Sequence, residues 1–285
     1  MVLNILKLVL RILNKISKEI EKIVKKSEEK KWWKKRVAIV LKSSDNKFIP
    51  RHLLAGKIEN GYQIMHNGQK IICGSYYGND VTKMLIANKG VHEPQEERVF
   101  GEVLKDLGQN SIMVELGSYW AFYSMWFLQK NPNGKSILYE PSLENMKFGE
   151  ENFKLNGLKG DFNQAFVSSN IDLNTSPCTV NLPYIFEQKK IKFLDILHSD
   201  IQGFELELLE GGRDILAEGK VGYLFISTHS NEIHSKCLKI IMECGFILIS
   251  EANLDESFSY DGIIVARFKS YNGIKPIAIS KKILN

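Results

Sequence analysis

Residues 112–124, IMVELGSYWAFYS, decide the fold that this sequence predicts. They form an apolar strand pattern that ends at Glu115, followed by a turn at Gly117 and the apolar start of a helix. A second apolar stretch, residues 136–141 (SILYEP), ends in another acid, Glu140. Two strand-end acids with a glycine between them are typical of a doubly wound sheet that holds a nucleoside.

The same residues indicate which nucleoside. Gly117 lets a backbone approach a ligand closely, and the Glu140 carboxylate can accept hydrogen bonds from ribose hydroxyls. The glycine set G-x-G-x-x-G, which holds a dinucleotide pyrophosphate, is missing here. We therefore expect a nucleoside without phosphates, which indicates S-adenosylmethionine.

The composition is that of a soluble globular protein. The 285 residues are 44% hydrophobic and 25% charged, enough for one sizeable α/β domain with additions. The four cysteines lack metal-binding spacing and predict reduced thiols. The apolar start is interrupted by Lys7 and Arg11 and has no cleavage site, so we expect a cytoplasmic protein without a cleaved signal.

The positive charge is confined to one end of the chain. Residues 1–36 hold 12 Lys and Arg against 4 Glu, a net charge of +8. Residues 37–285 hold the other 26 basic and 29 acidic residues, a net charge of −3. An enzyme acting on nucleic acid would spread basic residues around its site, so we expect no nucleic-acid partner.

Residues 3–30 repeat apolar side chains at every third or fourth position, which predicts one amphipathic helix. It should project from the catalytic body and lie on an anionic membrane, at the inner face, or pack against copies of itself in a homo-oligomer. The heptad-like spacing favours the oligomer, whereas Trp32, Trp33 and the lysines favour the membrane. A third alternative is docking on its own domain. The apolar side carries Leu3, Leu6, Leu10, Leu13, Ile16, Ile20, Ile23 and Val24, and the basic side carries Lys7, Arg11, Lys15, Lys18, Lys22 and Lys25.

Three regions follow one another along the chain. Residues 1–36 form the basic helix, residues 37–95 a lead-in region that shapes the acceptor site, and residues 96–285 the α/β domain. The lead-in region holds short strand patterns separated by Asn-Gly turns, which predict a hairpin. In the domain the expected strands are 111–115, 136–140, 161–167, 193–199 and 221–227. An antiparallel pair, 246–250 and 262–268, follows at the edge of the mostly parallel sheet.

Polar residues follow two further strands of this sheet. Asp200, Gln202 and Glu205 come after the fourth strand, and His229 comes after the fifth. Ligands in open α/β sheets bind beyond the carboxyl ends of the strands, so these side chains should meet at one rim. Each has a plain alternative: Asp200 as the cap of a helix over 202–211, and His229 as a turn residue. His198 and His234 are interpreted as structural.

Four runs in this chain resemble the FkbM-type S-adenosylmethionine-dependent methyltransferases: VELGSYWAFYS, YEPSLENMKFGEENFKLNG, ILHSDIQGFELELLEGG and FISTHS. The resemblance covers about residues 91–268, and its most specific piece is Asp200 to Glu205. It implies a Rossmann-like class I methyltransferase sheet and methyl transfer to a hydroxyl of a sugar or polyketide-like product, in the building of surface polysaccharides or secondary metabolites. Two departures are Glu115 for the commoner Asp and Ala121 for a glycine. Cofactor contacts are expected from Glu115, Gly117, Ser118, Tyr119, Glu140, Pro141 and Asp200.

The chemistry needs alignment and a base. A sulfonium methyl is already an activated electrophile, whereas a sugar hydroxyl needs a base to remove its proton. We expect Asp200 or His229 to be that base and Gln202 and Glu205 to orient them. Two potential ligands are too few for a metal site, so none is expected. Two alternatives remain: methyl transfer to an amine or phosphoramidate nitrogen, and a non-catalytic cofactor-binding assembly protein.

Overall fold

The computed structural model describes residues 2–282, with side chains described for residues 14, 15 and 17–282. The chain divides into two compact units, Met1–Ile39 and Val40–Asn285. None of the helices in the described part of the chain combines the length and apolar character needed to cross a bilayer.

The first unit is helical throughout its described length. Helix α1 runs from Val2 to Lys42, so the predicted helix is confirmed but is longer than residues 3–30. It continues through the basic stretch because the sequence has neither proline nor glycine before its end. The side chains of Leu3, Leu6, Leu10, Leu13 and Ile16 lie outside the described residues.

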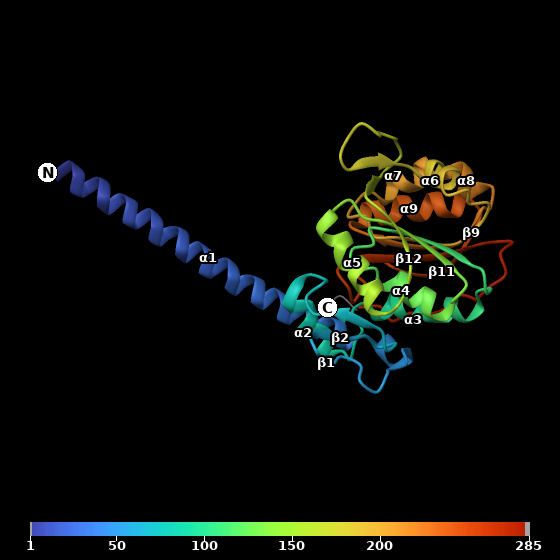
Figure 1. Ribbon diagram of the computed structural model, residues 1–285, viewed down its shortest axis with the longest axis horizontal. Helices are drawn as coiled ribbons and strands as arrows, with labels where there is room; N and C mark the ends of the chain where they lie inside the picture. Colours follow the sequence, from blue (N-terminus) through green and yellow to red (C-terminus); the bar gives the residue numbers. More distant parts are fainter. Residues whose placement is uncertain (1, 283–285) are drawn as a thin grey trace. The chain divides into compact units, whose positions relative to one another are not determined.

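The second unit is built on a seven-stranded sheet in the order β11-β12-β10-β9-β4-β5-β6. Five strands are parallel, and β12 runs antiparallel between β10 and β11. The predicted α/β fold, mostly parallel with an antiparallel last strand, is therefore confirmed (Figure 1). Its strands are β4 (Ile112–Leu116), β5 (Lys135–Tyr139), β6 (Asp161–Asn163), β9 (Leu194–Ser199), β10 (Val221–Thr228), β11 (Phe246–Ala252) and β12 (Gly262–Phe268).

Helices cover both faces of the sheet. Helices α3 (Pro94–Asp106) and α4 (Phe122–Lys130) lie on one face, and the other carries α6 (Leu182–Gln188), α7 (Glu205–Gly211), α8 (Arg213–Ala217) and α9 (Asn231–Glu243) (Figure 1). Apolar residues from both sides of the strands are buried, which explains why the strands read as nearly continuous apolar runs. The strand order reverses between β4 and β9, which is where ligands of such sheets bind.

One expected strand is divided in two. The segment 161–167 forms β6 and then a separate strand, β7 (Ala165–Val167), which pairs with β8 (Cys178–Val180) outside the main sheet. The division follows from β5, which offers no partner beyond Tyr139 because the chain turns away at Pro141.

The lead-in region packs on the sheet domain within the second unit. It contains the 3₁₀ helix η1 (Ser44–Phe48), strands β1 (Ile58–Glu59), β2 (Tyr62–Ile64) and β3 (Lys70–Ile72), and helix α2 (Gly78–Ala87). The predicted hairpin is confirmed, because β2 and β3 are antiparallel. Helix α5 (Leu143–Leu155) holds it: Asn152 Oδ1 accepts from the Ile72 N–H at 2.8 Å, and Asn156 Oδ1 accepts from the Lys70 N–H at 2.9 Å.

Gly117 joins the carboxyl ends of β4 and β9. The Asp200 N–H donates to the Leu116 carbonyl at 2.9 Å, which brings the Asp200 carbonyl against the Gly117 backbone. A Cβ atom on Gly117 would lie 1.8 Å from the Asp200 oxygen, and the glycine has a φ of +75°. Only glycine therefore fits at this junction.

Gly117→Ala should lower the free energy of unfolding by about 3 kcal/mol or more, because it adds a backbone clash to an unfavourable φ. Gly157→Ala is the matched control, since Gly157 has a φ of +67° and nothing within 4 Å of the added Cβ. It should cost only about 1 kcal/mol. Urea denaturation of both variants measures the difference; equal losses would contradict the proposed close contact.

Candidate active site

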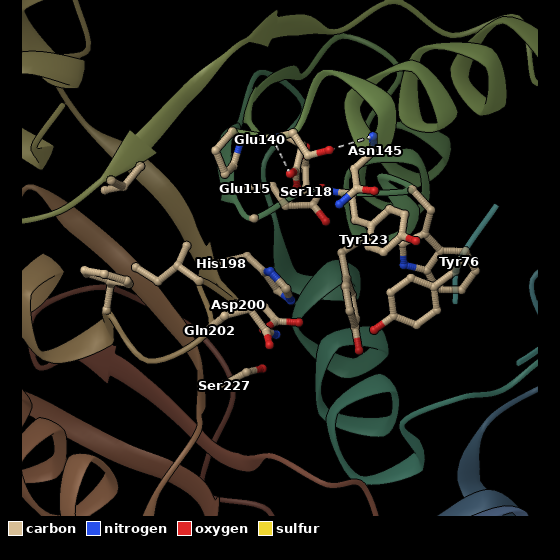
Figure 2. Close-up of a pocket in the computed structure, with 18 of the residues that line it drawn as sticks. Tyr76, Glu115, Ser118, Tyr123, Glu140, Asn145, His198, Asp200, Gln202 and Ser227 are labelled. Atoms are coloured by element: carbon tan, nitrogen blue, oxygen red, sulfur yellow. Dashed lines mark hydrogen bonds between the residues drawn. The ribbon is translucent and has the colours of Figure 1, made fainter. Parts of the chain in front are cut away.

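A cavity of about 550 Å³ opens at the carboxyl ends of β4, β5 and β9. Figure 2 shows Glu115, Ser118 and Glu140 gathered in one part of it, with Asp200, His198 and Ser227 in another. Of the predicted site residues, eight line the cavity: Glu115, Gly117, Ser118, Tyr119, Glu140, Pro141, Asp200 and Gln202. Glu205 and His229 lie behind them and contact the cavity only through Asp200 and its neighbours.

Glu140 is held by the loops on either side of it. Its carboxylate accepts from the Tyr119 N–H at 3.1 Å and from the Ser142 N–H at 2.9 Å. Burial raises the pKa of Glu140, and these two amides act in the opposite direction. The carboxylate is thus fixed at the cavity wall with lone pairs left to accept further donors.

Ser118, which lies near Glu140 on the cavity wall, offers a hydroxyl group that no described residue uses. Its hydroxyl is buried and has no hydrogen-bond partner among the described residues. Buried polar atoms are normally paired, so an orphaned hydroxyl on a cavity wall indicates a group that a ligand satisfies.

Glu115 is placed differently from Glu140. Its Oε2 accepts from the Ser124 N–H at 3.0 Å, so the side chain holds the first turn of α4. Burial raises the pKa of Glu115 to about 7, although the charge of His198 and the Ser124 bond lower it. Glu115 therefore anchors the start of α4, and its side chain also contributes to the cavity wall.

The loop between β4 and α4 has a strained backbone. Tyr119 and Ala121 have φ values of +39° and +60°, in the left-handed region that favours glycine. Ala121 stands where the FkbM-type pattern has glycine, and it keeps the conformation that a glycine would adopt easily. The Ala121 N–H donates to the Ser118 carbonyl at 2.6 Å, which holds this tight turn. Strain of this kind is found where the chain must present a functional surface.

Part of the cavity lining is apolar. Such a lining suits a flat, weakly polar group such as a nucleobase. The apolar residues are Ala165, Phe166, Val167, Pro177, Ile201 and Phe204.

Residues 73–248, more than half of the chain, match the family model of the methyltransferase FkbM domain. The chain belongs to the FkbM methyltransferase family. It is therefore an S-adenosylmethionine-dependent methyltransferase, and the alternative of a non-catalytic assembly protein is wrong.

Solved structures with a similar fold are distant in sequence. The M. capricolum TrmK structure in complex with S-adenosyl-homocysteine has 14% identity and a TM-score of 0.43, over 61% of this chain and 69% of that one. The precorrin-6y C5,15-methyltransferase from Geobacter metallireducens also has 14% identity and a TM-score of 0.43, over 61% and 89%. No curated protein sequence matches this chain.

The cavity of this FkbM methyltransferase fits S-adenosylmethionine. The apolar lining suits the adenine, Glu140 suits the ribose hydroxyls, and the unpaired Ser118 hydroxyl suits a polar group of the methionine part. When bound, this cofactor supplies a methyl group already activated for transfer.

Asp200 belongs to a cluster of charged groups at the cavity wall. Its Oδ1 lies 3.2 Å from His229 Nε2 and accepts from Gln202 Nε2 at 3.0 Å. Asp261 Oδ1 lies 3.4 Å from the same His229 nitrogen. On the other side of the ring, His229 Nδ1 lies 2.9 Å from Glu205 Oε1. The helix-cap alternative for Asp200 is wrong, because α7 begins only at Glu205 and its N-cap is Phe204.

His229 is protonated in this cluster. Burial lowers its pKa, but the hydrogen bonds to Asp200 and Glu205 and the charge of Asp261 outweigh burial and raise it to about 10. An imidazolium cannot accept another proton, so the expectation that His229 serves as the general base is not favoured by this geometry. We assign it instead to holding Asp200, which faces the cavity.

Several cavity residues were missed in the sequence. His198, interpreted as structural, lines the cavity with its Nε2 2.7 Å from Glu96 Oε1, and Glu96 Oε2 accepts from Ser227 Oγ at 3.4 Å. Burial lowers the pKa of His198, but Glu96 outweighs it and the net shift is upward. The position of His198, two residues before Asp200 and on the same side of β9, was the available signal. Other lining residues that the sequence did not single out include Tyr76, Tyr77, His92, Glu93, Tyr123 and Asn145.

A buried network supports this wall. His92 bridges two carboxylates, with Nε2 3.0 Å from Glu93 Oε2 and Nδ1 2.6 Å from Glu97 Oε1. Burial lowers its pKa, but both carboxylates outweigh burial and raise it to about 10. Glu93 also accepts from the Tyr123 hydroxyl at 3.1 Å, so the lead-in region and α4 are tied together beneath the cavity.

Glu140→Ala should weaken S-adenosylmethionine binding by about 1–3 kcal/mol, because the ribose hydroxyls lose their acceptor. Glu144→Ala, on an exposed position of α5, is the control and should bind normally. Titration calorimetry with both variants checks the result, and unchanged affinity in Glu140→Ala would remove the carboxylate from the cofactor site.

The stability of the protein should depend on His229 and pH. The folded-state pKa of His229 is about 10, above the value of about 6.5 expected in the unfolded chain. The protonated ring therefore makes its full contribution to the free energy of unfolding below a pH of about 6.5. This contribution is lost as the pH rises toward about 10. The difference in unfolding free energy between the wild-type protein and His229→Gln should therefore shrink as the pH rises through this window.

Urea denaturation at several pH values measures this difference. His92, whose pKa is also about 10, is present in both proteins and drops out of the comparison. A difference that stays constant with pH would show that His229 is neutral in the folded protein.

Proposed function

We propose that this methyltransferase transfers the methyl group to a hydroxyl of a sugar or glycan. The observation that carries the proposal is an aromatic wall across the cavity from the Asp200 carboxylate. Sugars combine apolar C–H faces with hydroxyl rims, so they bind where aromatic rings and carboxylates face the same space.

The aromatic wall comes from two parts of the chain. Tyr76 and Trp120 stack with their ring centroids 4.4 Å apart and their planes 9° apart. Tyr77, about half exposed, and Tyr119 continue this wall with ring centroids 5.4 Å apart. The wall thus joins the lead-in region to the loop after β4, beside the expected position of the methyl group.

Asp200 is the proposed base. Its carboxylate faces the cavity and takes the proton of the acceptor hydroxyl as the hydroxyl oxygen gains the methyl group. His229 and Gln202 fix one carboxylate oxygen, which leaves the other for the acceptor. Glu205 holds the far side of the His229 ring and accepts from the Gly203 N–H at 3.1 Å, so it supports the loop that carries Asp200.

An amine acceptor is the second candidate. Four carboxylates line the cavity, which favours a cationic group: Glu93, Glu115, Glu140 and Asp200. A protonated amine must lose its proton before it can accept a methyl group, so Asp200 would have the same role with either acceptor. The position of the transferred methyl group, on oxygen or on nitrogen, separates the two candidates.

Asp200→Asn should lower turnover by about 100-fold or more while S-adenosylmethionine affinity stays normal, because the amide cannot take the proton. Asp214→Asn, an exposed position on α8, is the control and should turn over normally. The assay follows radiolabelled methyl transfer to a panel of nucleotide-sugars, oligosaccharides and amino sugars, with mass spectrometry of the product. Normal turnover of Asp200→Asn would remove Asp200 from the chemistry, and methylation confined to nitrogen would favour the second candidate.

A further inference from the structure

Helix α1 presents apolar side chains that its own unit does not cover. Ile20, Ile23 and Val24 are 54%, 67% and 49% exposed. They lie three and four residues apart, which places them on one side of the helix, and the sequence continues this side toward Leu13 and Ile16. This apolar stripe is a surface that water solvates poorly.

The opposite side of the same helix is cationic. Lys15, Lys18, Lys22 and Lys25 are exposed there, again at spacings of three and four. Only Lys22 of these four has an ion pair among the described residues, with Glu19 at 2.9 Å and fully on the surface. An apolar stripe opposite a row of lysines suits the interface of a bilayer, with the stripe among the acyl chains and the lysines among the headgroups.

We propose that helix α1 binds the surface of an anionic phospholipid membrane and lies in its plane. Charge selects this occupant. Residues 1–36 carry a net charge of +8, which acidic headgroups neutralise, whereas residues 37–285 carry −3 and bring no attraction of their own. The helix is therefore the part of the chain that recognises the membrane.

A second copy of the helix fits this surface less well. In a parallel coiled coil with Ile20 and Ile23 in the seam, residues at the g positions of one helix face residues at the e positions of the other. Lys26 would then face Lys31 of the other copy, and Glu19 would face Val24. No opposite charges meet at these flanking positions, and each copy adds +8 to the assembly.

The tryptophans do not extend the apolar stripe. Trp32 lies seven residues after Lys25 and Trp33 eleven after Lys22, so both rings lie on the side of the lysines. There they pack edge to face at 4.9 Å, with the Arg36 guanidinium 5.7 and 5.3 Å from the ring centroids. The proposed membrane contact therefore rests on the residues before position 28.

Vesicle co-sedimentation of the full chain tests the proposal. The protein should sediment with phosphatidylcholine vesicles that contain phosphatidylglycerol, stay in solution with phosphatidylcholine alone, and be released by high salt. Ile20→Gln with Ile23→Gln should weaken partitioning about 100-fold, because two buried aliphatic side chains are lost. Lys18→Gln with Lys22→Gln should weaken it about 25-fold, since each cation near an anionic surface contributes a factor of about five.

Asn14→Gln is the matched control, because it changes an exposed side chain on the lysine side of the same helix, four residues before Lys18, and should bind as the wild type does. Circular dichroism and calorimetry with S-adenosylmethionine show that each variant keeps its helix and its catalytic unit. The proposal is overturned if the full chain ignores anionic vesicles. It is equally overturned if neutral vesicles bind it as well, or if light scattering shows an oligomer that Ile20→Gln with Ile23→Gln dissociates while vesicles bind neither protein.

Discussion

The active site depends on one close contact, between the backbone of Gly117 and the carbonyl of Asp200. It joins the ends of β4 and β9, the two strands between which the order of the sheet reverses. Any side chain at position 117 would push apart the loop that carries Tyr119 and the loop that carries the proposed base. The glycine expected to admit a ligand therefore has a second and stricter role, which is to bring the two halves of the cavity together.

Buried charge organises the rest of the cavity. His92 and His229 are each held between carboxylates, and the ionic hydrogen bonds offset the desolvation of both imidazolium rings. Both nitrogens of each ring lie within 3.2 Å of a carboxylate oxygen, which restricts the position of the two rings. This arrangement converts histidines, which titrate freely in water near neutral pH, into fixed cations that set the position of Asp200 on one side and Glu93 on the other.

The sequence predicted the sheet well because each strand is an apolar run whose end is marked by a polar or turn-forming residue next to it in the sequence. The apolar run that ends at Glu115 and the run that ends at Glu140 are both strands in the structure, and the last pair of strands, β11 and β12, is antiparallel as expected. The segment 161–167 was predicted as one strand because its division depends on where β5 ends, which is not a property of the segment itself. Helix α1 was predicted too short because charge, rather than a helix-breaking residue, marked its end.

The site was less predictable than the fold. Asp200 was found because it follows a strand, whereas the protonation of His229 depends on Glu205 and Asp261, which reach it from elsewhere in the chain. His198 was interpreted as structural because its spacing from Asp200, two residues further on, was not taken into account. The aromatic wall was missed because Tyr76 lies far from Trp120 in the sequence, and only folding makes them stack.

The attachment of the lead-in hairpin to α5 does not depend on the hairpin's own side chains. Asn152 and Asn156 bond to the main chain of β3 at Ile72 and Lys70, and the Asn156 amide returns a bond to the Lys70 carbonyl at 2.6 Å. Main-chain groups are the same whatever side chains they carry. The hairpin is thus held on α5 by hydrogen bonds that do not require particular side chains on β3. Its sequence can therefore change while the segment after β3, which brings Tyr76 and Tyr77 to the cavity, keeps its position.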